Sequence, residues 1–83
     1  MRLMLFGTEG CHLCEQAEEV IAECLTHHPS IAIEFVDIAA TGSEQWYELY
    51  AIRIPVLLHP ESQIELSWPF DEADVNHFIS NLH

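Results

Sequence analysis

The sequence predicts a single α/β domain over residues 1–83, a four-stranded mixed sheet with helices on both faces. Short apolar runs and helical patterns follow one another in the order β-α-β-α-β-β-α. The first strand, first helix and second strand form a βαβ unit, so these strands should be parallel with a right-handed crossover. The last two strands flank a tight polar break, which is typical of an antiparallel hairpin.

The first half of the chain contains the βαβ unit. Residues Leu3 to Phe6 form a short apolar run, consistent with a buried strand. The second strand should run from Ile31 to about Asp37, and Pro29 should end the preceding helix because prolines disfavour helical backbone before them. One helical face is predicted by apolar residues spaced by three and four positions: Leu13, Ala17, Val20, Ile21, Cys24 and Leu25.

The second half contains two further helices and the hairpin. Thr41 and Glu44 fit a capping box at the start of a short helix that includes Trp46, Leu49 and Tyr50. The hairpin strands are expected over residues 54–59 and 63–66. Asp71 can cap the last helix. The inner face of that helix should consist of Val75, Phe78, Ile79 and Leu82.

The charge balance limits the partners of the chain. It has fourteen acidic residues, two arginines and no lysine, which gives a formal net charge of −12. Nucleic acids and anionic membranes both require cationic surfaces, so neither is an expected partner. The apolar opening Met1–Phe6 is too short for a signal peptide, and no stretch approaches the roughly 20 apolar residues of a membrane helix. We expect a soluble, cytoplasmic and monomeric protein.

The motif Cys11-His12-Leu13-Cys14 lies between the first strand and the first helix. Its spacing brings two thiols within disulfide range on the first helical turn, which favours thiol–disulfide chemistry. A structural zinc site would require four ligands, and the chain has no second CxxC, so no metal is expected. Cys24 lies about 15 Å further along the helix and is predicted to be a buried core thiol.

The surroundings of Cys11 predict a moderately activated thiol. A helix N-terminus favours the thiolate form of a cysteine. His12 could reinforce this effect if protonated, or its ring could point to solvent. Glu9 and Glu15 oppose it, because nearby negative charge disfavours a thiolate.

With this CxxC and with Ile54-Pro55-Val56 opening the third strand, the chain resembles the thioredoxin fold. More narrowly, it is similar to the glutaredoxin-like proteins of bacteria along nearly its whole length. The resemblance implies that Pro55 is cis and faces the CxxC, and that the backbone of Ile54 pairs with a bound thiol substrate. It also implies that Cys11 is the exposed nucleophile and Cys14 the buried resolving thiol.

The same resemblance makes glutathione a candidate co-substrate. Asp71 and Glu72 match the acidic position that holds the glutathione amino group, and Arg53 could bind a glutathione carboxylate or pair with a neighbouring acid. The usual lysine before the motif is absent, however, and Ser67–Phe70 replace the usual Gly-Gly pair. The aromatic residues of that segment are expected to pack the last helix rather than to form a rim of the site. The motif therefore supports dithiol chemistry better than glutathione specificity.

The function expected from these residues is that of a glutaredoxin-like thiol–disulfide oxidoreductase. Its substrates would be protein, mixed or low-molecular-weight disulfides, and Cys11 and Cys14 would carry the reaction. Electrons would come from glutathione or from a thioredoxin-type reductase, without a tightly bound cofactor. An iron–sulfur cluster shared across a dimer is known for some glutaredoxins and rests here on analogy alone. The alternative is a redox-inert binding or adaptor domain with the same fold.

Overall fold

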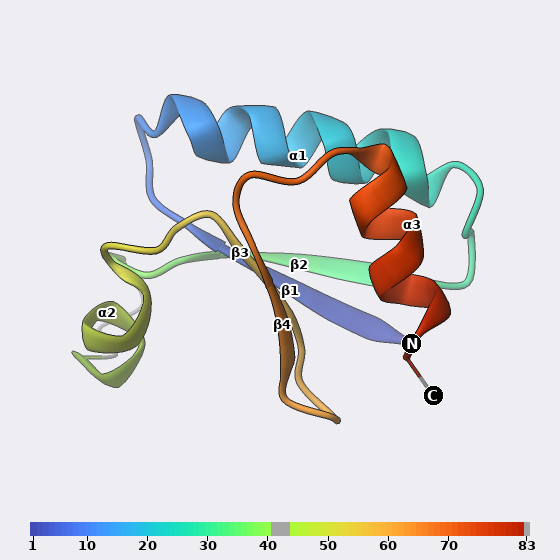
Figure 1. The fold of residues 1–83 in the computed structure, drawn as a ribbon. Coiled ribbons are helices and arrows are strands. Elements are labelled where there is room, and N and C mark those ends of the chain that lie inside the picture. Colours follow the sequence, from blue (N-terminus) through green and yellow to red (C-terminus); the bar gives the residue numbers. More distant parts are fainter. Residues whose placement is uncertain (41–43, 83) are drawn as a thin grey trace.

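The computed structural model describes residues 1–40 and 44–82, and all seven predicted elements lie in this part of the chain (Figure 1). Their order is the expected β-α-β-α-β-β-α. The elements are β1 (Arg2–Gly7), α1 (His12–Leu25), β2 (Ala32–Asp37), α2 (Glu44–Tyr50), β3 (Val56–His59), β4 (Ile64–Ser67) and α3 (Glu72–Ser80).

The four strands form one mixed sheet in the order β2-β1-β3-β4. β1 and β2 are parallel, as the βαβ unit predicted, and Gly7 pairs with Asp37 at their carboxyl ends. β3 is antiparallel to β1, with Phe6 opposite Val56, and β4 is antiparallel to β3. The predicted fold class is therefore confirmed, and the first strand of the chain lies in the interior of the sheet.

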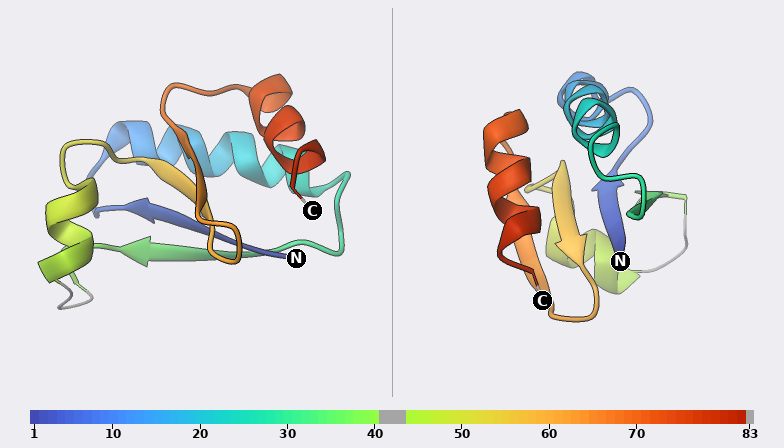
Figure 2. Two further views of the ribbon diagram at one scale, coloured as in Figure 1. Left: turned by 60° about the horizontal axis from the view of Figure 1, so that its bottom comes forward. Right: turned by 90° about the vertical axis from the view of Figure 1, so that its right-hand side faces the viewer.

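α1 and α3 lie on one face of the sheet, and α2 lies at the carboxyl end of β1 and β2 (Figures 1 and 2), where Tyr50 packs against the other face. Leu3, Leu5 and Leu57 face α1 and α3 and belong to one apolar cluster with those helices. The alternate residues Met4 and Phe6 face the other way and cluster with Tyr50 at the end of α2, among others. This alternation follows from the two-residue period of a strand, and it gives β1 apolar side chains on both faces.

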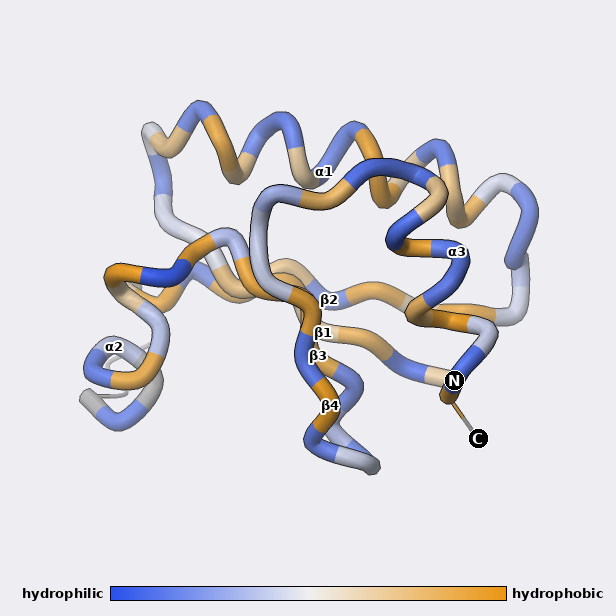
Figure 3. Tube along the Cα trace, viewed as in Figure 1, coloured by the Kyte–Doolittle hydropathy of each residue, from blue (hydrophilic) through white to orange (hydrophobic). Residues whose placement is uncertain are grey.

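The last helix agrees with its prediction in detail. Asp71 is its N-cap and accepts a hydrogen bond from the backbone N–H of Asp74 at 2.8 Å, and the Asp74 carboxylate accepts one from the Asp71 N–H at 3.1 Å. All four residues predicted for its inner face are buried: Val75, Phe78, Ile79 and Leu82. Leu82, however, lies beyond the end of the helix at Ser80. Along α1, polar and apolar residues follow one another with the period of the helix (Figure 3), and the buried ones include Ala17, Ile21 and Cys24. Leu13, predicted for the same face, is 45% exposed.

The second strand differs from its prediction in which side chains it buries. In the sequence, Ile31, Ile33 and Phe35 alternate with Ala32 and Glu34, the pattern of a strand with one apolar face. In the structure, however, Phe35 is 52% exposed, whereas Val36 is buried. The reason is that β2 is an edge strand, so α1 covers the side of Ile33 and Phe35 only in part. The capping box predicted for Thr41 and Glu44 lies outside the described side chains.

Several element ends also shift from their predicted positions. β3 begins at Val56, two residues after the predicted start at position 54. α1 ends at Leu25 with Thr26 as its C-cap, and the Thr26 hydroxyl donates to the Glu23 carbonyl at 2.6 Å. β4 begins at Ile64, because Gln63 has a positive φ of 62° and completes the turn of the hairpin. Within residues 1–40 and 44–82, no helix has the length and apolar character needed to cross a membrane.

Candidate functional site

One end of the sheet gathers the segments that the sequence singled out. The carboxyl ends of β1 and β2 meet there through the pairing of Gly7 with Asp37. β3 begins at the same end, because Val56 lies opposite Phe6, and β4 finishes there with Ser67 opposite Val56. The CxxC, which follows β1, the Ile54–Pro55 segment, which precedes β3, and the segment after β4 are therefore neighbours in space.

The two cysteines of the motif are joined by a disulfide at the start of α1. The Cα atoms of Cys11 and Cys14 are 5.2 Å apart. Gly10 has a positive φ of 77°, a conformation that glycine adopts at little cost, and this turns the chain into the helix. Cys11 is the N-cap with extended backbone, and its Sγ accepts a hydrogen bond from the Cys14 backbone N–H at 3.2 Å. Sulfur thus takes the place of the oxygen that usually caps a helix.

The two sulfurs differ in exposure. Cys11 is partly exposed, whereas Cys14 is only 6% exposed and lies behind it. Gly7 packs directly against Cys14, and a Cβ atom at position 7 would lie 3.0 Å from the Cys14 Sγ. The end of β1 therefore allows the first turn of α1 to approach closely, and a larger residue there would have to displace the sulfur.

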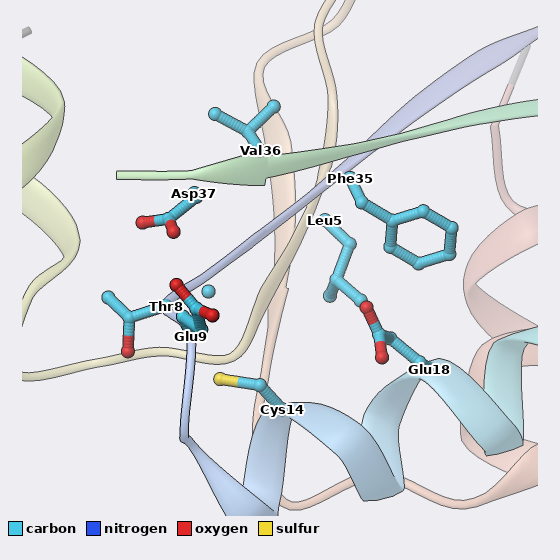
Figure 4. Close-up of a pocket in the computed structure, with 9 residues that line it drawn as sticks. Leu5, Thr8, Glu9, Cys14, Glu18, Phe35, Val36 and Asp37 are labelled. Carbon is cyan, nitrogen blue, oxygen red and sulfur yellow. The ribbon is translucent and has the colours of Figure 1, made fainter. Parts of the chain in front are cut away.

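A cavity of about 230 Å³ lies beside the disulfide, between α1 and the ends of β1 and β2 (Figure 4). Cys14 lines it together with three carboxylates, those of Glu9, Glu18 and Asp37. The Asp37 carboxylate also accepts hydrogen bonds from the backbone N–H groups of Ala39, at 2.9 Å, and Ala40, at 3.3 Å. The surroundings of the disulfide on this side are therefore acidic.

The Pro55 segment has the expected conformation. The Ile54–Pro55 peptide is cis, and Pro55 is buried at the start of β3. The Pro55 carbonyl accepts a hydrogen bond from the Trp68 N–H at 3.2 Å, and the Ile54 N–H donates to the Tyr50 carbonyl at 3.0 Å. The Trp68–Pro69 peptide is also cis, a conformation that was not predicted from the sequence.

The segment after β4 packs against the core, as expected. Trp68 is partly buried against the cluster under α1 and α3, and its ring makes an edge-to-face contact with Phe70 at 5.0 Å between centroids. Phe70 itself is 4% exposed. The packing interpretation of these aromatic residues is therefore confirmed.

His12 points to solvent. Its side chain is 92% exposed, and its Nδ1 atom lies 3.7 Å from a carboxylate oxygen of Glu15. Of the two positions considered for this ring, the structure shows the solvent-facing one, on the exposed face of the first helical turn.

Arg53 forms an ion pair with Glu65 of β4. The Tyr50 hydroxyl donates to the other Glu65 oxygen at 2.9 Å, and the Arg53 guanidinium lies 5.3 Å from the centroid of the Tyr50 ring. Burial raises the pKa of Tyr50 above its ordinary value, and the hydrogen bond to Glu65 adds to the effect. Of the two alternatives considered for Arg53, a substrate carboxylate or a neighbouring acid, the structure shows an acidic neighbour. Neither Glu65 nor Tyr50 was predicted as its partner, because hairpin register and helix packing bring these residues together.

Asp71 and Glu72 lie at the start of α3, and Cys24 of α1 contacts this end of the helix. The Asp71 carboxylate is engaged in capping the helix, while the Glu72 side chain is exposed. Cys24 is 1% exposed and its thiol donates to the Glu72 backbone carbonyl at 3.6 Å, so the predicted core position is confirmed. Burial, followed by the charges of Glu72, Glu23 and Asp71, raises the pKa of Cys24.

Among the described residues, no group of three or more His, Cys, Asp or Glu side chains could hold a metal ion.

Comparisons with known proteins agree with this geometry. Residues 2–80 match the family model described as a glutaredoxin-like domain (DUF836). A structural genomics target protein from X. campestris is 31% identical, with a TM-score of 0.75 over 98% of this chain and 99% of that one. No curated protein matches the chain.

Two more distant structures share the fold. Thioredoxin O2 from Arabidopsis thaliana, in its oxidised state, is 20% identical with a TM-score of 0.71, covering 98% of this chain and 73% of that one. A malarial protein is 14% identical with a TM-score of 0.72, covering 95% of this chain and 92% of that one. From the family match over residues 2–80, the chain belongs to the glutaredoxin-like domain (DUF836) family, and its fold is that of the thioredoxin structure.

Proposed function

We propose that the protein is a thiol–disulfide oxidoreductase in which Cys11 and Cys14 carry the reaction. The observation that supports this most directly is the asymmetry of the disulfide at the start of α1. Cys11 is partly exposed and capped by a backbone N–H, whereas Cys14 is buried behind it. A substrate can reach the first sulfur, and only an internal reaction can reach the second.

The proposed cycle starts from the dithiol form. The Cys11 thiolate attacks one sulfur of a substrate disulfide, forming a mixed disulfide and releasing the other substrate sulfur as a thiolate. The Cys14 thiolate then attacks the Cys11 sulfur, forming the Cys11–Cys14 disulfide and releasing the second substrate thiolate. Two electrons pass to the substrate, and the two protons of the dithiol end on the two product thiols. A thiol reductant, either glutathione or a dithiol reductase, would restore the dithiol.

The start of α1 favours the attacking form of Cys11. In the disulfide, the Cys14 N–H points at the Cys11 sulfur at 3.2 Å. A thiolate at the same position would keep this donor and would also gain from the helix dipole. The acidic neighbours Glu9 and Glu15 act in the opposite direction, so the expected activation is moderate.

We assign substrate positioning to the Ile54–Pro55 segment. The Ile54 N–H is already occupied by the Tyr50 carbonyl, whereas the Ile54 carbonyl accepts no backbone hydrogen bond within residues 1–40 and 44–82. A substrate segment would therefore pair with the carbonyl of Ile54, not with both of its backbone groups.

Three single variants test the proposal by exchange with a neutral peptide disulfide. Cys11→Ser should abolish exchange, and Cys14→Ser should stop after the first step and accumulate a mixed disulfide on Cys11, visible as a mass increase. Cys24→Ala is the matched control, because it removes the buried third thiol and should retain exchange. If Cys11→Ser exchanges as fast as the wild type, or if the reduced wild type does not exchange at all, the oxidoreductase proposal is wrong. The second result would support a redox-inert binding domain.

A further inference from the structure

We propose that Glu65 is a specificity-determining residue that makes the site discriminate against anionic disulfides and favour neutral or cationic protein segments. It does so by occupying Arg53, the one arginine next to the substrate-positioning segment. This inference rests on the proposed oxidoreductase function and concerns the class of substrate accepted by the same site.

Arg53 is the only permanent cation available at this end of the sheet. The full sequence has two arginines and no lysine. The other arginine, Arg2, lies at the start of β1, five residues before Gly7 and thus about 16 Å away along the strand. Arg53 lies two residues before Pro55, where it could otherwise meet a substrate carboxylate.

Glu65 forms its ion pair with Arg53 from a position on β4 that the strand pairing determines. It lies on β4 opposite Leu58, and its two carboxylate oxygens are bound by the Arg53 guanidinium and the Tyr50 hydroxyl. The guanidinium also lies over the Tyr50 ring, so both partners of the ion pair are tied to the end of α2. A substrate carboxylate would have to displace Glu65 from these contacts before it could use Arg53.

Apart from His12, the nearest exposed side chains flanking Cys11 in the sequence are acidic or apolar. Glu9 and Glu15 are exposed on either side of it in the sequence, and their charge repels a substrate carboxylate. Leu13 within the motif is 45% exposed. Beside the substrate-positioning segment, Ile52, just before Arg53, is 96% exposed. These side chains offer apolar contact to a protein segment. Each half of glutathione disulfide, in contrast, carries two carboxylates and one ammonium group and would meet mainly like charge.

The ion pair is suited to mutation because it contributes little to the fold. The side chains of Arg53 and Glu65 are 40% and 28% exposed, and ion pairs this close to solvent contribute little to stability. Glu65→Gln should therefore fold, keep an acceptor for Tyr50 and release Arg53. Glu61→Gln is the matched control, since Glu61 is exposed in the turn of the same hairpin and its replacement changes the net charge equally.

The experiment compares rate constants of the reduced proteins with glutathione disulfide and with a lysine-flanked peptide disulfide. Glu65→Gln should raise the ratio of the glutathione rate to the peptide rate about fivefold, the size expected for a charge at the edge of an interface. Glu61→Gln should change this ratio less than twofold, roughly the effect of screened charge alone. Adding Arg53→Gln to Glu65→Gln should return the ratio to that of the wild type.

The possible outcomes distinguish failure of the specificity inference from failure of the oxidoreductase function. If the wild type exchanges with both disulfides but Glu65→Gln and Glu61→Gln shift the ratio equally, Glu65 has no role in specificity while the oxidoreductase function stands. If the wild type prefers glutathione disulfide, the inference is also overturned. If it exchanges with neither disulfide, the oxidoreductase function itself fails, and the inference fails with it.

Discussion

The face of the sheet under α1 and α3 is held by close apolar packing, whereas the face under α2 combines a smaller apolar cluster with polar contacts. On the first face, Cys14 touches Gly7, and Ile21 is 1% exposed in the same helix. On the second, Phe6 stacks on Tyr50 at 4.4 Å between ring centroids, and Tyr50 in turn binds Glu65.

This difference separates the two halves of the candidate site. The disulfide lies on the face under α1 and α3, where close packing of side chains fixes the positions of the cysteines. The Pro55 segment is hydrogen-bonded to the other face, because the Ile54 N–H donates to the Tyr50 carbonyl at the end of α2. Changes in side-chain volume should therefore affect the cysteines most, and changes in charge or pH should affect the Pro55 segment most.

The largest effect on stability should come from truncating the packed face. Ile21→Ala removes a buried side chain from α1 and should lower the free energy of unfolding by about 2–5 kcal/mol, because it leaves a cavity. Urea unfolding measures the change. Gln16→Ala, on the exposed side of the same helix, is the control and should stay within about 0.5 kcal/mol of the wild type. Equal effects of the two variants would contradict the packing account of this face.

A smaller loss of stability is expected from a substitution at Gly7, where the end of β1 packs against the disulfide. Gly7→Val adds atoms where a Cβ alone would already lie 3.0 Å from the Cys14 Sγ, so overpacking should cost about 1–3 kcal/mol. Thermal unfolding measures this cost, with Thr8→Val as a control that adds no volume. In a Cys14→Ala background the cost of Gly7→Val should shrink. An undiminished cost would mean that the strain lies elsewhere than at the sulfur.

The smallest effect should come from the α2 face, and it should depend on pH. Tyr50→Phe removes the hydrogen bond to Glu65 and should lower stability by about 0.5–1.5 kcal/mol at neutral pH. Tyr47→Phe is the matched control, because Tyr47 is 52% exposed. Urea unfolding of both variants at pH 7 measures the difference between them.

The pH dependence of Tyr50 has a definite sign. The pKa of Tyr50 is raised in the folded protein, so the folded state holds the phenol proton more tightly than the unfolded state does. Its contribution to stability is therefore complete below the ordinary value of 10.0 and is lost as the pH rises above it. Wild type should lose more stability than Tyr50→Phe between pH 9 and 11, roughly one unit on either side of that value. Parallel curves for the two proteins would contradict the placement of Tyr50.

Most of the fold could be predicted because local patterns and global architecture agree in this chain. The βαβ unit, the hairpin, the cap at Asp71 and the buried Cys24 follow from periodicity and capping chemistry. The cis Ile54–Pro55 peptide was expected from the resemblance. The burial of β2 was predicted less well, since periodicity identifies a face of a strand but not whether the strand lies at an edge.

The sequence predicted the chemical groups of the candidate site, but only some of the contacts between them. The sequence by itself determined the CxxC, its position before a helix, the acidic charge and the scarcity of cations, because these depend on neighbouring residues and composition. Only the tertiary structure decided that Gly7 packs on Cys14 and that Glu65 takes up Arg53. Both contacts join residues from different elements, and strand register and helix docking, which no local pattern specifies, determine which side chains meet.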